Sequence, residues 1–154
     1  MKIIIRPTKF HDITQMIMVN ESSMTEHYSK EVWSQKFYEG QSHSFVAIGA
    51  GMVIGYVFCD TTSIVSFAID SKFRCHGIGT QLLYHCLNTF TSPVYLHVRP
   101  SNASALRLYR SLGFVEREIA RGYYVSPIED AYLMEWKPRE TKYVERHKIH
   151  TADS

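Results

Sequence analysis

Apolar residues recur along this chain with two different periodicities. Some segments hold short apolar or alternating runs bounded by turn residues, as strands do. Others repeat an apolar residue every three or four positions, as amphipathic helices do. The first pattern predicts strands at residues 2–6, 44–48, 52–59, 63–69, 94–98, 114–120 and 131–136. The sequence Gly49-Ala50-Gly51 predicts a hairpin turn between the second and third of these strands.

The second periodicity, an apolar residue every three or four positions, predicts helices at residues 9–20, 29–40, 78–90 and 102–112. Ser29 is a favourable N-cap, and Gly40 suits the C′ position just beyond a helix. Asn102 and Gly113 are a second pair of start and stop signals. Helices interspersed among strands predict an α/β fold, with helices packed around a mixed sheet.

A length of 154 residues fits one domain, and the core pattern ends near residue 136. We therefore expect a single domain at residues 1–136, followed by a charged, flexible tail at residues 137–154. The tail carries His147 and His150, but two histidines alone do not make a metal site, so no metal is expected. Weak contact with the ribosome or with RNA is the alternative to a solvated tail.

Composition narrows the environment and the partners. A net charge of +2 is too small to indicate nucleic acid as the main partner, so no DNA binding is expected. The three cysteines are odd in number and lack Cys-x-x-Cys spacing, which indicates reduced thiols and a cytoplasmic protein. The longest apolar run, residues 52–59, is too short to span a bilayer, and the first seven residues are too short for the apolar part of a signal peptide. No membrane association is expected.

The most informative motif is Phe-Arg-Cys-His-Gly-Ile-Gly-Thr at residues 73–80, between a predicted strand and a predicted helix. Such a turn exposes backbone N–H groups at a helix N-terminus, where the helix dipole favours an anion. Glycines let a phosphate approach the main chain, and Arg74 adds positive charge. The motif therefore predicts a phosphorylated ligand.

The residues around these glycines exclude two common glycine-loop motifs. A P-loop places Lys and then Ser or Thr after its last glycine, and Thr80-Gln81 stands there instead. A dinucleotide fingerprint needs a third glycine where Leu82 stands, and an acidic residue about twenty positions on, where residues 95–99 have none. The remaining pattern is Arg-x-x-Gly-x-Gly. Taken alone, it is equally compatible with a strand-to-helix turn that binds nothing.

A second block of motifs lies downstream. Residues 94–109 read VYLHVRPSNASALRLY, and Gly113-Phe114 and Tyr123-Tyr124 follow. With the glycine loop, this order resembles the GNAT acetyltransferases. Among them it is most similar to catalytic subunits of N-terminal (Nα) acetyltransferases, a group that includes ribosomal-protein alanine acetyltransferases and eukaryotic and archaeal enzymes. The family pattern is Leu-His or Leu-Glu, then Asn-x-x-Ala-x-x-x-Tyr, then Gly-Phe, then Tyr-Tyr. The resemblance covers about residues 2–136.

The resemblance implies the GNAT fold, with a mixed, mostly antiparallel seven-stranded sheet flanked by about four helices. Its central parallel strands, here residues 63–69 and 94–98, splay apart and hold acetyl-CoA, the acetyl donor. The pyrophosphate would lie on the glycine loop, where Cys75 and His76 contribute backbone N–H groups. Asn102 would hold the pantetheine arm, although a plain N-cap explains it equally well. The implied cofactor contacts are Phe67, Ala68, Ile69, Arg74, Cys75, His76, Gly77, Ile78, Gly79, Thr80, Asn102, Ser104 and Tyr109.

Two residues are the implied catalytic groups. Tyr109 occupies the position of a tyrosine that protonates the leaving thiolate, and the alternative is an ordinary core tyrosine. His97 occupies the Leu-His position and is the candidate base. Strand alternation puts Tyr95 and His97 on one face. A free α-amine has a pKa of about 8 and a lysine amine of about 10.4, so a weak base suits the former. Some relatives carry a tyrosine where Ser63 stands, so the partner of His97 is an open question.

The implied acceptor site comes from the loop between the first two helices and from a tyrosine pair. The implied substrate contacts are Met24, Glu26, Tyr28, His97, Tyr123 and Tyr124. Packing at a hairpin edge is the alternative for one of the two adjacent tyrosines, since alternation makes it hard for both to face the core.

These inferences predict an N-terminal acetyltransferase that transfers acetyl directly, in a ternary complex, to the α-amino group of a protein. The alternatives are an Nε-lysine or small-amine acetyltransferase of the same fold, and a non-catalytic CoA-binding protein. The expected partners are protein or peptide N-termini, with the ribosome or an auxiliary subunit as further candidates. A monomer is expected.

Overall fold

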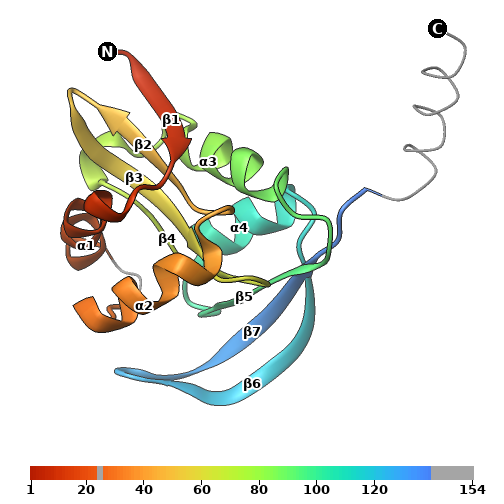
Figure 1. The fold of residues 1–154 in the computed structure, drawn as a ribbon. Coiled ribbons are helices and arrows are strands. Elements are labelled where there is room, and N and C mark those ends of the chain that lie inside the picture. The colour runs from red at the N-terminus through yellow and green to blue at the C-terminus, as the bar shows by residue number, and fades with distance from the viewer. Residues whose placement is uncertain (24–25, 140–154) are drawn as a thin grey trace, which may run out of the picture.

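The computed structural model describes residues 1–23 and 26–139. Strands and helices follow one another in an α/β arrangement (Figure 1). The strands are β1 (Ile3–Pro7), β2 (Phe45–Gly49), β3 (Met52–Cys59), β4 (Ile64–Ile69), β5 (Val94–Val98), β6 (Val115–Val125) and β7 (Ile128–Trp136). The helices are α1 (Ile13–Glu21), α2 (Lys30–Gly40), α3 (Ile78–Leu87) and α4 (Ala103–Ser111), with short 3-10 turns at Phe10–Asp12 and Ser71–Phe73.

The strands form two sheets that meet at one point. Antiparallel pairing gives the orders β1-β2-β3-β4 and β5-β7-β6. A parallel bridge between Ser63 and Tyr95 joins them, and the Tyr95 N–H donates to the Thr62 carbonyl at 3.0 Å. Beyond this bridge β4 and β5 belong to separate sheets. Within residues 1–23 and 26–139, the expected seven strands and the splayed parallel pair are therefore confirmed.

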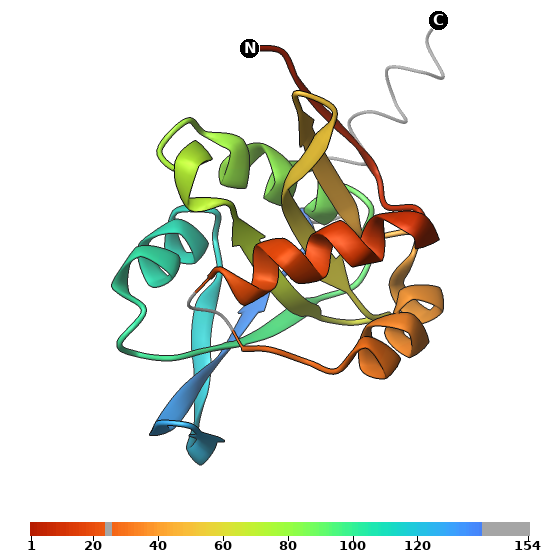
Figure 2. The same cartoon turned by 90° about the vertical axis from the view of Figure 1, so that its left-hand side faces the viewer.

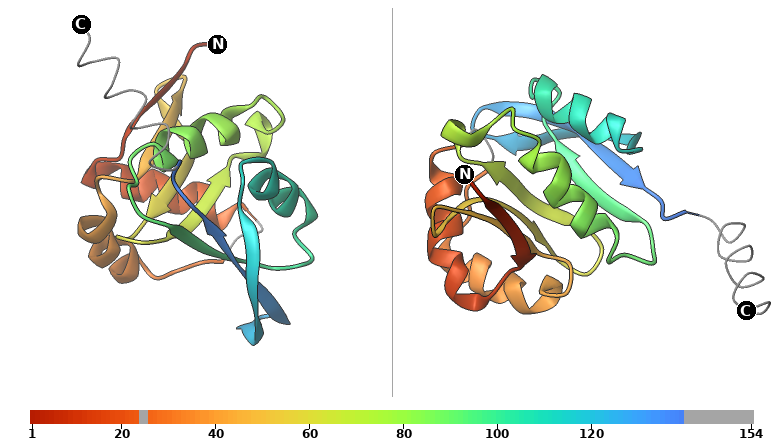
Figure 3. Two further views of the ribbon diagram at one scale, coloured as in Figure 1. Left: turned by 90° about the vertical axis from the view of Figure 1, so that its right-hand side faces the viewer. Right: turned by 90° about the horizontal axis from the view of Figure 1, so that it is seen from above.

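Helices cover both faces of the first sheet (Figures 2 and 3). Helices α1 and α2 pack on one face around Met16, Trp33 and Tyr56. Helix α3 packs on the opposite face, where Leu82 and Leu83 are fully buried. The apolar core on the α3 face continues into α4 and the β5-β7-β6 sheet. One apolar cluster therefore packs behind both of the diverging strands, β4 and β5. Among the described residues, no helix has the length and apolarity needed to cross a membrane.

Several start and stop signals act as expected. The Ser29 hydroxyl accepts the Val32 N–H, and Asn102 Oδ1 accepts the Ala105 N–H, so both residues cap their helices. The hairpin turn holds Ala50 and Gly51 at positive φ, as a tight two-residue connection requires.

The interpretation of Gly40 as a C′ residue is wrong. Gly40 is the last residue of α2, and a Cβ atom there would lie 1.7 Å from the Cys59 carbonyl oxygen. It is glycine because β3 passes directly against the end of the helix. The last two strands are also longer than expected. They form one extended hairpin that projects from the body of the molecule (Figure 1).

Candidate active site

A pocket of about 870 Å³ lies where the two sheets diverge. Its lining combines the glycine loop, the facing strands β4 and β5, the start of α4, the tyrosine pair of β6 and the end of the α1–α2 loop. Nearly all residues predicted for the site are part of this lining: Glu26, Tyr28, Phe67, Ala68, Ile69, Arg74, Cys75, Gly77, Ile78, Gly79, Thr80, His97, Asn102, Ser104, Tyr109, Tyr123 and Tyr124. His76 is exposed outside the lining, and Met24 lies outside the described residues.

The glycine loop is shaped for an anion. Gly77 is the N-cap of α3 with φ of +77°, a left-handed conformation that glycine adopts without a steric penalty. Because glycine has no side chain, no side-chain acceptor occupies the first turn of α3, and no acidic residue stands there. The orphan N–H groups of that turn are thus available to a ligand, with the helix dipole favouring negative charge. Arg74, whose Nε donates to the Ile69 carbonyl at 3.1 Å, holds an exposed guanidinium beside the loop.

Glycine is needed at position 79 for a different physical reason than at position 77. A Cβ atom at this position would lie 3.0 Å from Phe67 Cζ and 3.6 Å from Leu108 Cδ2. The missing side chain lets α3 approach the wall of the pocket formed by β4. Within the described chain, β4 pairs with β3 along one edge and with β5 at the Ser63 bridge alone. The backbone of residues 67–69 therefore presents a strand edge to the pocket, suited to an extended ligand.

Asn102 serves as a cap and still faces the pocket. Its Oδ1 accepts hydrogen bonds from the Ala105 N–H and the Ser104 hydroxyl, both at 3.3 Å. Asn102 and Ser104 also belong to the lining. The capping interpretation is thus satisfied, and the residue is still placed to contact a ligand.

Tyr109 is held in the apolar wall between the two sheets. It is 7% exposed, and its ring packs against Phe67 and Phe114, with centroids 6.1 and 5.6 Å away. Burial raises the pKa of its hydroxyl well above the ordinary value of 10. Tyr109 therefore stays protonated near neutral pH and can serve as a proton donor.

His97 points from β5 into the pocket. Val94, Leu96 and Val98 are buried on the other face of the strand, as alternation predicts. The His97 ring stacks on Tyr123, and partial burial lowers its pKa below the ordinary 6.5. A larger share of His97 is consequently neutral at pH 7, which is the form that accepts a proton.

Ser63 and its neighbours form a separate polar group at the base of the splay. The Ser63 hydroxyl donates to Asp60 Oδ1 at 2.7 Å, and the Thr62 and Ser63 N–H groups donate to the same oxygen. Burial of Asp60 opposes its ionisation, but these hydrogen bonds and nearby Lys36 outweigh burial and lower its pKa. Ser63 is therefore already hydrogen-bonded to a carboxylate.

The predicted acceptor side includes residues 26–28, the described end of the α1–α2 loop. A buried network holds this loop, because Asn20 Nδ2 donates to the Glu26 carbonyl at 2.9 Å and to the Tyr56 hydroxyl at 3.1 Å. The Tyr56 hydroxyl also lies 2.7 Å from Ser66 Oγ, and burial raises its pKa to about 12. Tyr28 follows, half-buried against Trp33. Residues 26–28 are thus tied to α1, α2 and the first sheet.

Arg99 is a pocket residue that the sequence reasoning missed. It directly follows β5, two residues after His97, and its side chain is only 12% exposed. Its Nε and Nη2 atoms pair with the Glu26 carboxylate at 3.1 Å each. The alternation that singled out His97 places Arg99 on the same face, and this signal was sufficient to find it.

Comparison with known proteins agrees with the geometry. Residues 10–114 match the acetyltransferase (GNAT) family, and the chain belongs to this family. The N-alpha-acetyltransferase of Sulfurisphaera tokodaii is 32% identical over 151 residues, covering 84% of this chain and 90% of that protein. The [ribosomal protein bS18]-alanine N-acetyltransferase of Salmonella typhimurium is 34% identical over 116 residues, covering 66% and 78%. The crystal structure of Ard1 from Thermoplasma volcanium matches 91% of this chain and all of that chain, with a TM-score of 0.81 and 28% identity.

Proposed function

We propose that this protein is an N-terminal acetyltransferase that moves the acetyl group of acetyl-CoA to the α-amino group of a protein. One observation carries the proposal. One pocket is lined by the glycine turn that begins α3, by His97 with its lowered pKa, by Tyr109 with its raised pKa, and by Tyr28, Tyr123 and Tyr124. The names of the similar proteins, N-alpha-acetyltransferase and ribosomal protein alanine N-acetyltransferase, support the same activity.

The residues present fit acetyl-CoA as the donor. The first turn of α3 and Arg74 would hold the pyrophosphate, and the free edge of β4 at residues 67–69 would pair with the pantetheine arm. Asn102 and Ser104 would contact the same arm from α4. When bound, the thioester would supply an activated acetyl group.

His97 and Tyr109 would divide the proton transfers. His97, directly or through a water, would take the proton of the α-amine as its nitrogen attacks the thioester carbonyl. A C–N bond forms and the C–S bond breaks, and Tyr109 would protonate the departing thiolate. Tyr28, Tyr123, Tyr124 and Glu26 would bind the first residues of the acceptor.

The α-amine is favoured over a lysine because of its lower pKa. An α-amine of pKa about 8 is partly neutral near pH 7, whereas a lysine amine of about 10.4 is almost fully charged. A histidine whose pKa is below 6.5 is too weak a base to deprotonate many lysines. Acceptors with Met or a small first residue are expected, with broad tolerance, because tyrosine contacts to the backbone do not select side chains.

The working unit would be one chain in the cytoplasm, with protein N-termini as its partners and the ribosome or an auxiliary subunit as further candidates. Cys59, Cys75 and Cys86 are free thiols, as a reducing compartment favours. The domain would comprise residues 1–136, with residues 137–154 as a tail that lies mostly outside the described residues.

The decisive experiment compares two acceptor peptides of one sequence. The first has a free α-amine and no lysine, and the second is Nα-blocked and carries one lysine. Mass spectrometry of the products should show acetylation of the first, with variation of its first two residues mapping the preference. Faster reaction of the blocked lysine peptide would establish the lysine alternative. Reaction of neither, with acetyl-CoA binding intact, would establish a non-catalytic binding protein.

A further inference from the structure

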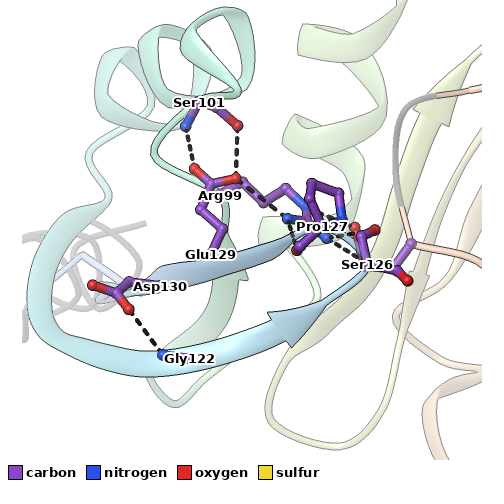
Figure 4. Close-up of polar contacts among 8 residues, drawn as sticks. Arg99, Ser101, Gly122, Ser126, Pro127, Glu129 and Asp130 are labelled. Carbon is purple, nitrogen blue, oxygen red and sulfur yellow. Dashed lines mark hydrogen bonds and ion pairs between the residues drawn. The ribbon is translucent and has the colours of Figure 1, made fainter.

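Arg99 joins three segments that are distant in sequence. Besides its double contact with Glu26, its Nη1 donates to the Pro127 carbonyl at 2.9 Å and to Glu129 Oε1 at 3.3 Å. Its Nη2 donates to the Ser126 carbonyl at 3.3 Å. Figure 4 shows Arg99 reaching from the end of β5 to the turn between β6 and β7. One side chain therefore links the end of β5, the acceptor loop and the tip of the last hairpin.

All the donors of this guanidinium are in use. Arginine has five N–H donors in a rigid planar fork, and the five contacts to Glu26, Ser126, Pro127 and Glu129 account for them. A ligand would find no free N–H on Arg99 to bind. Its place in the pocket lining is thus explained by positioning of other residues, not by direct recognition of a substrate carboxylate.

The partners of Arg99 are themselves anchored. Glu129 accepts hydrogen bonds from the Ser101 N–H and hydroxyl at 2.9 Å, which ties the hairpin to the turn before α4 (Figure 4). Glu26 is held through its carbonyl by Asn20 and through its carboxylate by Arg99. Glu26 is therefore held both by its backbone and by its side chain.

The guanidinium also reaches the tyrosine pair. Its Cζ atom lies 4.1 Å above the centre of the Tyr124 ring, a cation–π contact. Tyr124 meets Tyr123 edge to face, and Tyr123 stacks on His97. Contacts thus run without a break from Glu26 through Arg99 and the two tyrosines to the candidate base.

We propose that Arg99 is a positioning residue for the acceptor, which holds Glu26 and Tyr124 at a fixed separation across the mouth of the acceptor site. This inference rests on the proposed function for the identity of the acceptor. It goes beyond that function by assigning acceptor affinity to a residue that touches neither substrate. A lysine would not substitute, because its ammonium is a single point with three donors and cannot make a bidentate pair and two carbonyl contacts together.

The test compares Arg99→Gln and Arg99→Lys with Arg110→Gln. Arg110 forms an exposed ion pair with Glu116 on the outside of α4, away from the pocket lining. With the peptide that the wild type acetylates best, both Arg99 variants should raise the acceptor KM at least tenfold. The KM for acetyl-CoA should stay within twofold, and Arg110→Gln should change neither. An unchanged acceptor KM, or an equal loss of donor affinity, would overturn the proposal.

A double-mutant cycle separates positioning from general damage. Glu26→Gln should raise the acceptor KM in the wild type but add little in Arg99→Gln, because the contact is already lost. Independent, additive effects would contradict a shared role. If Arg99→Gln does not fold, Glu129→Gln weakens one of the five Arg99 contacts and also the Ser101 contacts of the hairpin, while the pairing of Arg99 with Glu26 stays. It should raise the acceptor KM less than Arg99→Gln is expected to, and no change would count against the proposal.

Hydrogen exchange provides a readout that needs no acceptor. The amides of residues 26–28 and 123–129 should exchange faster in Arg99→Gln than in the wild type, with those of α3 unaffected. Unchanged exchange in these segments would overturn the positioning role. A wild-type enzyme that acetylates no α-amine would refute the proposed function instead, and the exchange result would stand separately.

Discussion

The His97 imidazole lies flat on the ring of Tyr123, with centroids 4.2 Å apart and ring planes 7° apart. A bulge in β6 creates this stack. Ala120 pairs with Ala131 and Tyr124 with Glu129, so four steps along β6 oppose two steps along β7. Gly122 takes a φ of +60° in the bulge, and its N–H donates to Asp130 at 2.8 Å (Figure 4). The extra residues break strict alternation, and both tyrosines reach the pocket.

Removal of His97 should slow the reaction without weakening donor binding. His97→Ala is expected to lower kcat by about 10²-fold, the usual contribution of a general base, while acetyl-CoA affinity by calorimetry stays nearly constant. Because burial lowers the pKa of His97, the wild-type rate should rise with pH through a value below 6.5. That limb should disappear in the variant, leaving the limb of the substrate amine near pH 8.

The Tyr123 stack provides a check on this assignment. Tyr123→Phe keeps a ring against His97 and should keep the pH profile, whereas Tyr123→Ala exposes the imidazole and should move the acid limb upward toward pH 6.5. Near-full activity of His97→Ala with an unshifted profile would reduce His97 to a positioning residue. In that case the amine would lose its proton to bulk water before it binds.

The Tyr109 hydroxyl should protonate the leaving thiolate and should not act on the attacking amine. Tyr109→Phe preserves packing against Phe67 and Phe114 and removes only the hydroxyl, so donor affinity should hold while kcat falls by at least ~10²-fold. Since the pKa of Tyr109 is raised, the wild-type rate should show no loss from its ionisation below about pH 10. Tyr84→Phe, an exposed tyrosine on α3, is the matched control, and equal kcat values for both variants would reject the proton-donor role.

Substitution of Gly79 or Gly77 in the glycine loop should impair the donor site for two different physical reasons. Gly79→Val would press on Phe67 and narrow the pocket, and should weaken acetyl-CoA binding more than tenfold. Gly77→Ala adds a Cβ atom in open space but at positive φ, which costs about 1–2 kcal/mol of backbone strain and should disturb the first turn of α3. Gly51→Ala has the same strain at φ of +76° in a remote hairpin turn, so it should lower stability and leave calorimetric affinity unchanged.

Reversal of the charge beside the loop is a further test of the phosphate site. Arg74→Glu places a carboxylate where the pyrophosphate is proposed to bind, and should weaken acetyl-CoA binding by about 2–3 kcal/mol, the scale of a charge-assisted hydrogen bond. The loss should shrink as salt is raised. Unchanged affinity in both folded Gly79→Val and folded Arg74→Glu would remove this loop from the donor site.

The start of the chain contains an ion pair that should govern stability in acid. Arg6 binds both carboxylate oxygens of Asp12 at 2.7 and 2.9 Å, and the Lys9 N–H donates at 2.7 Å, while Asp12 is 3% exposed. Burial alone would raise the pKa of Asp12, but these hydrogen bonds outweigh it and lower the pKa. Asp12→Ala should reduce the free energy of unfolding at pH 7 by about 2 kcal/mol.

The pH dependence of that loss has a definite sign. A carboxyl with a lowered folded-state pKa stabilises fully above its unfolded value of about 3.9 and loses this contribution as pH falls through the folded value. The difference between wild type and Asp12→Ala should therefore narrow below pH 4 in urea titrations. Glu116→Gln, which breaks an exposed pair, should change stability little at either pH. A constant difference from pH 7 to pH 3 would contradict the assignment.

Features that depend on neighbouring residues could be predicted from the sequence alone. Spacing and local hydrogen bonding predict the order of strands and helices, the caps at Ser29 and Asn102 and the glycine turn into α3. Strand alternation predicts that His97 faces away from the buried residues of β5. These are short-range properties, so they depend on the identity of residues within a few positions along the chain. The positive φ of Gly77 is of this kind, since only the local turn requires it.

Contacts between distant segments were decided by the tertiary structure. Gly40 was misinterpreted as a helix terminator because its reason is the Cys59 carbonyl on another strand. The stack of Tyr123 on His97 needs a bulge whose length is set by pairing with β7. The five contacts of Arg99 exist because β5, the α1–α2 loop and the last hairpin converge around one guanidinium. No local pattern encodes that convergence, since it depends on how the two sheets diverge and on which side chains meet across the space between them.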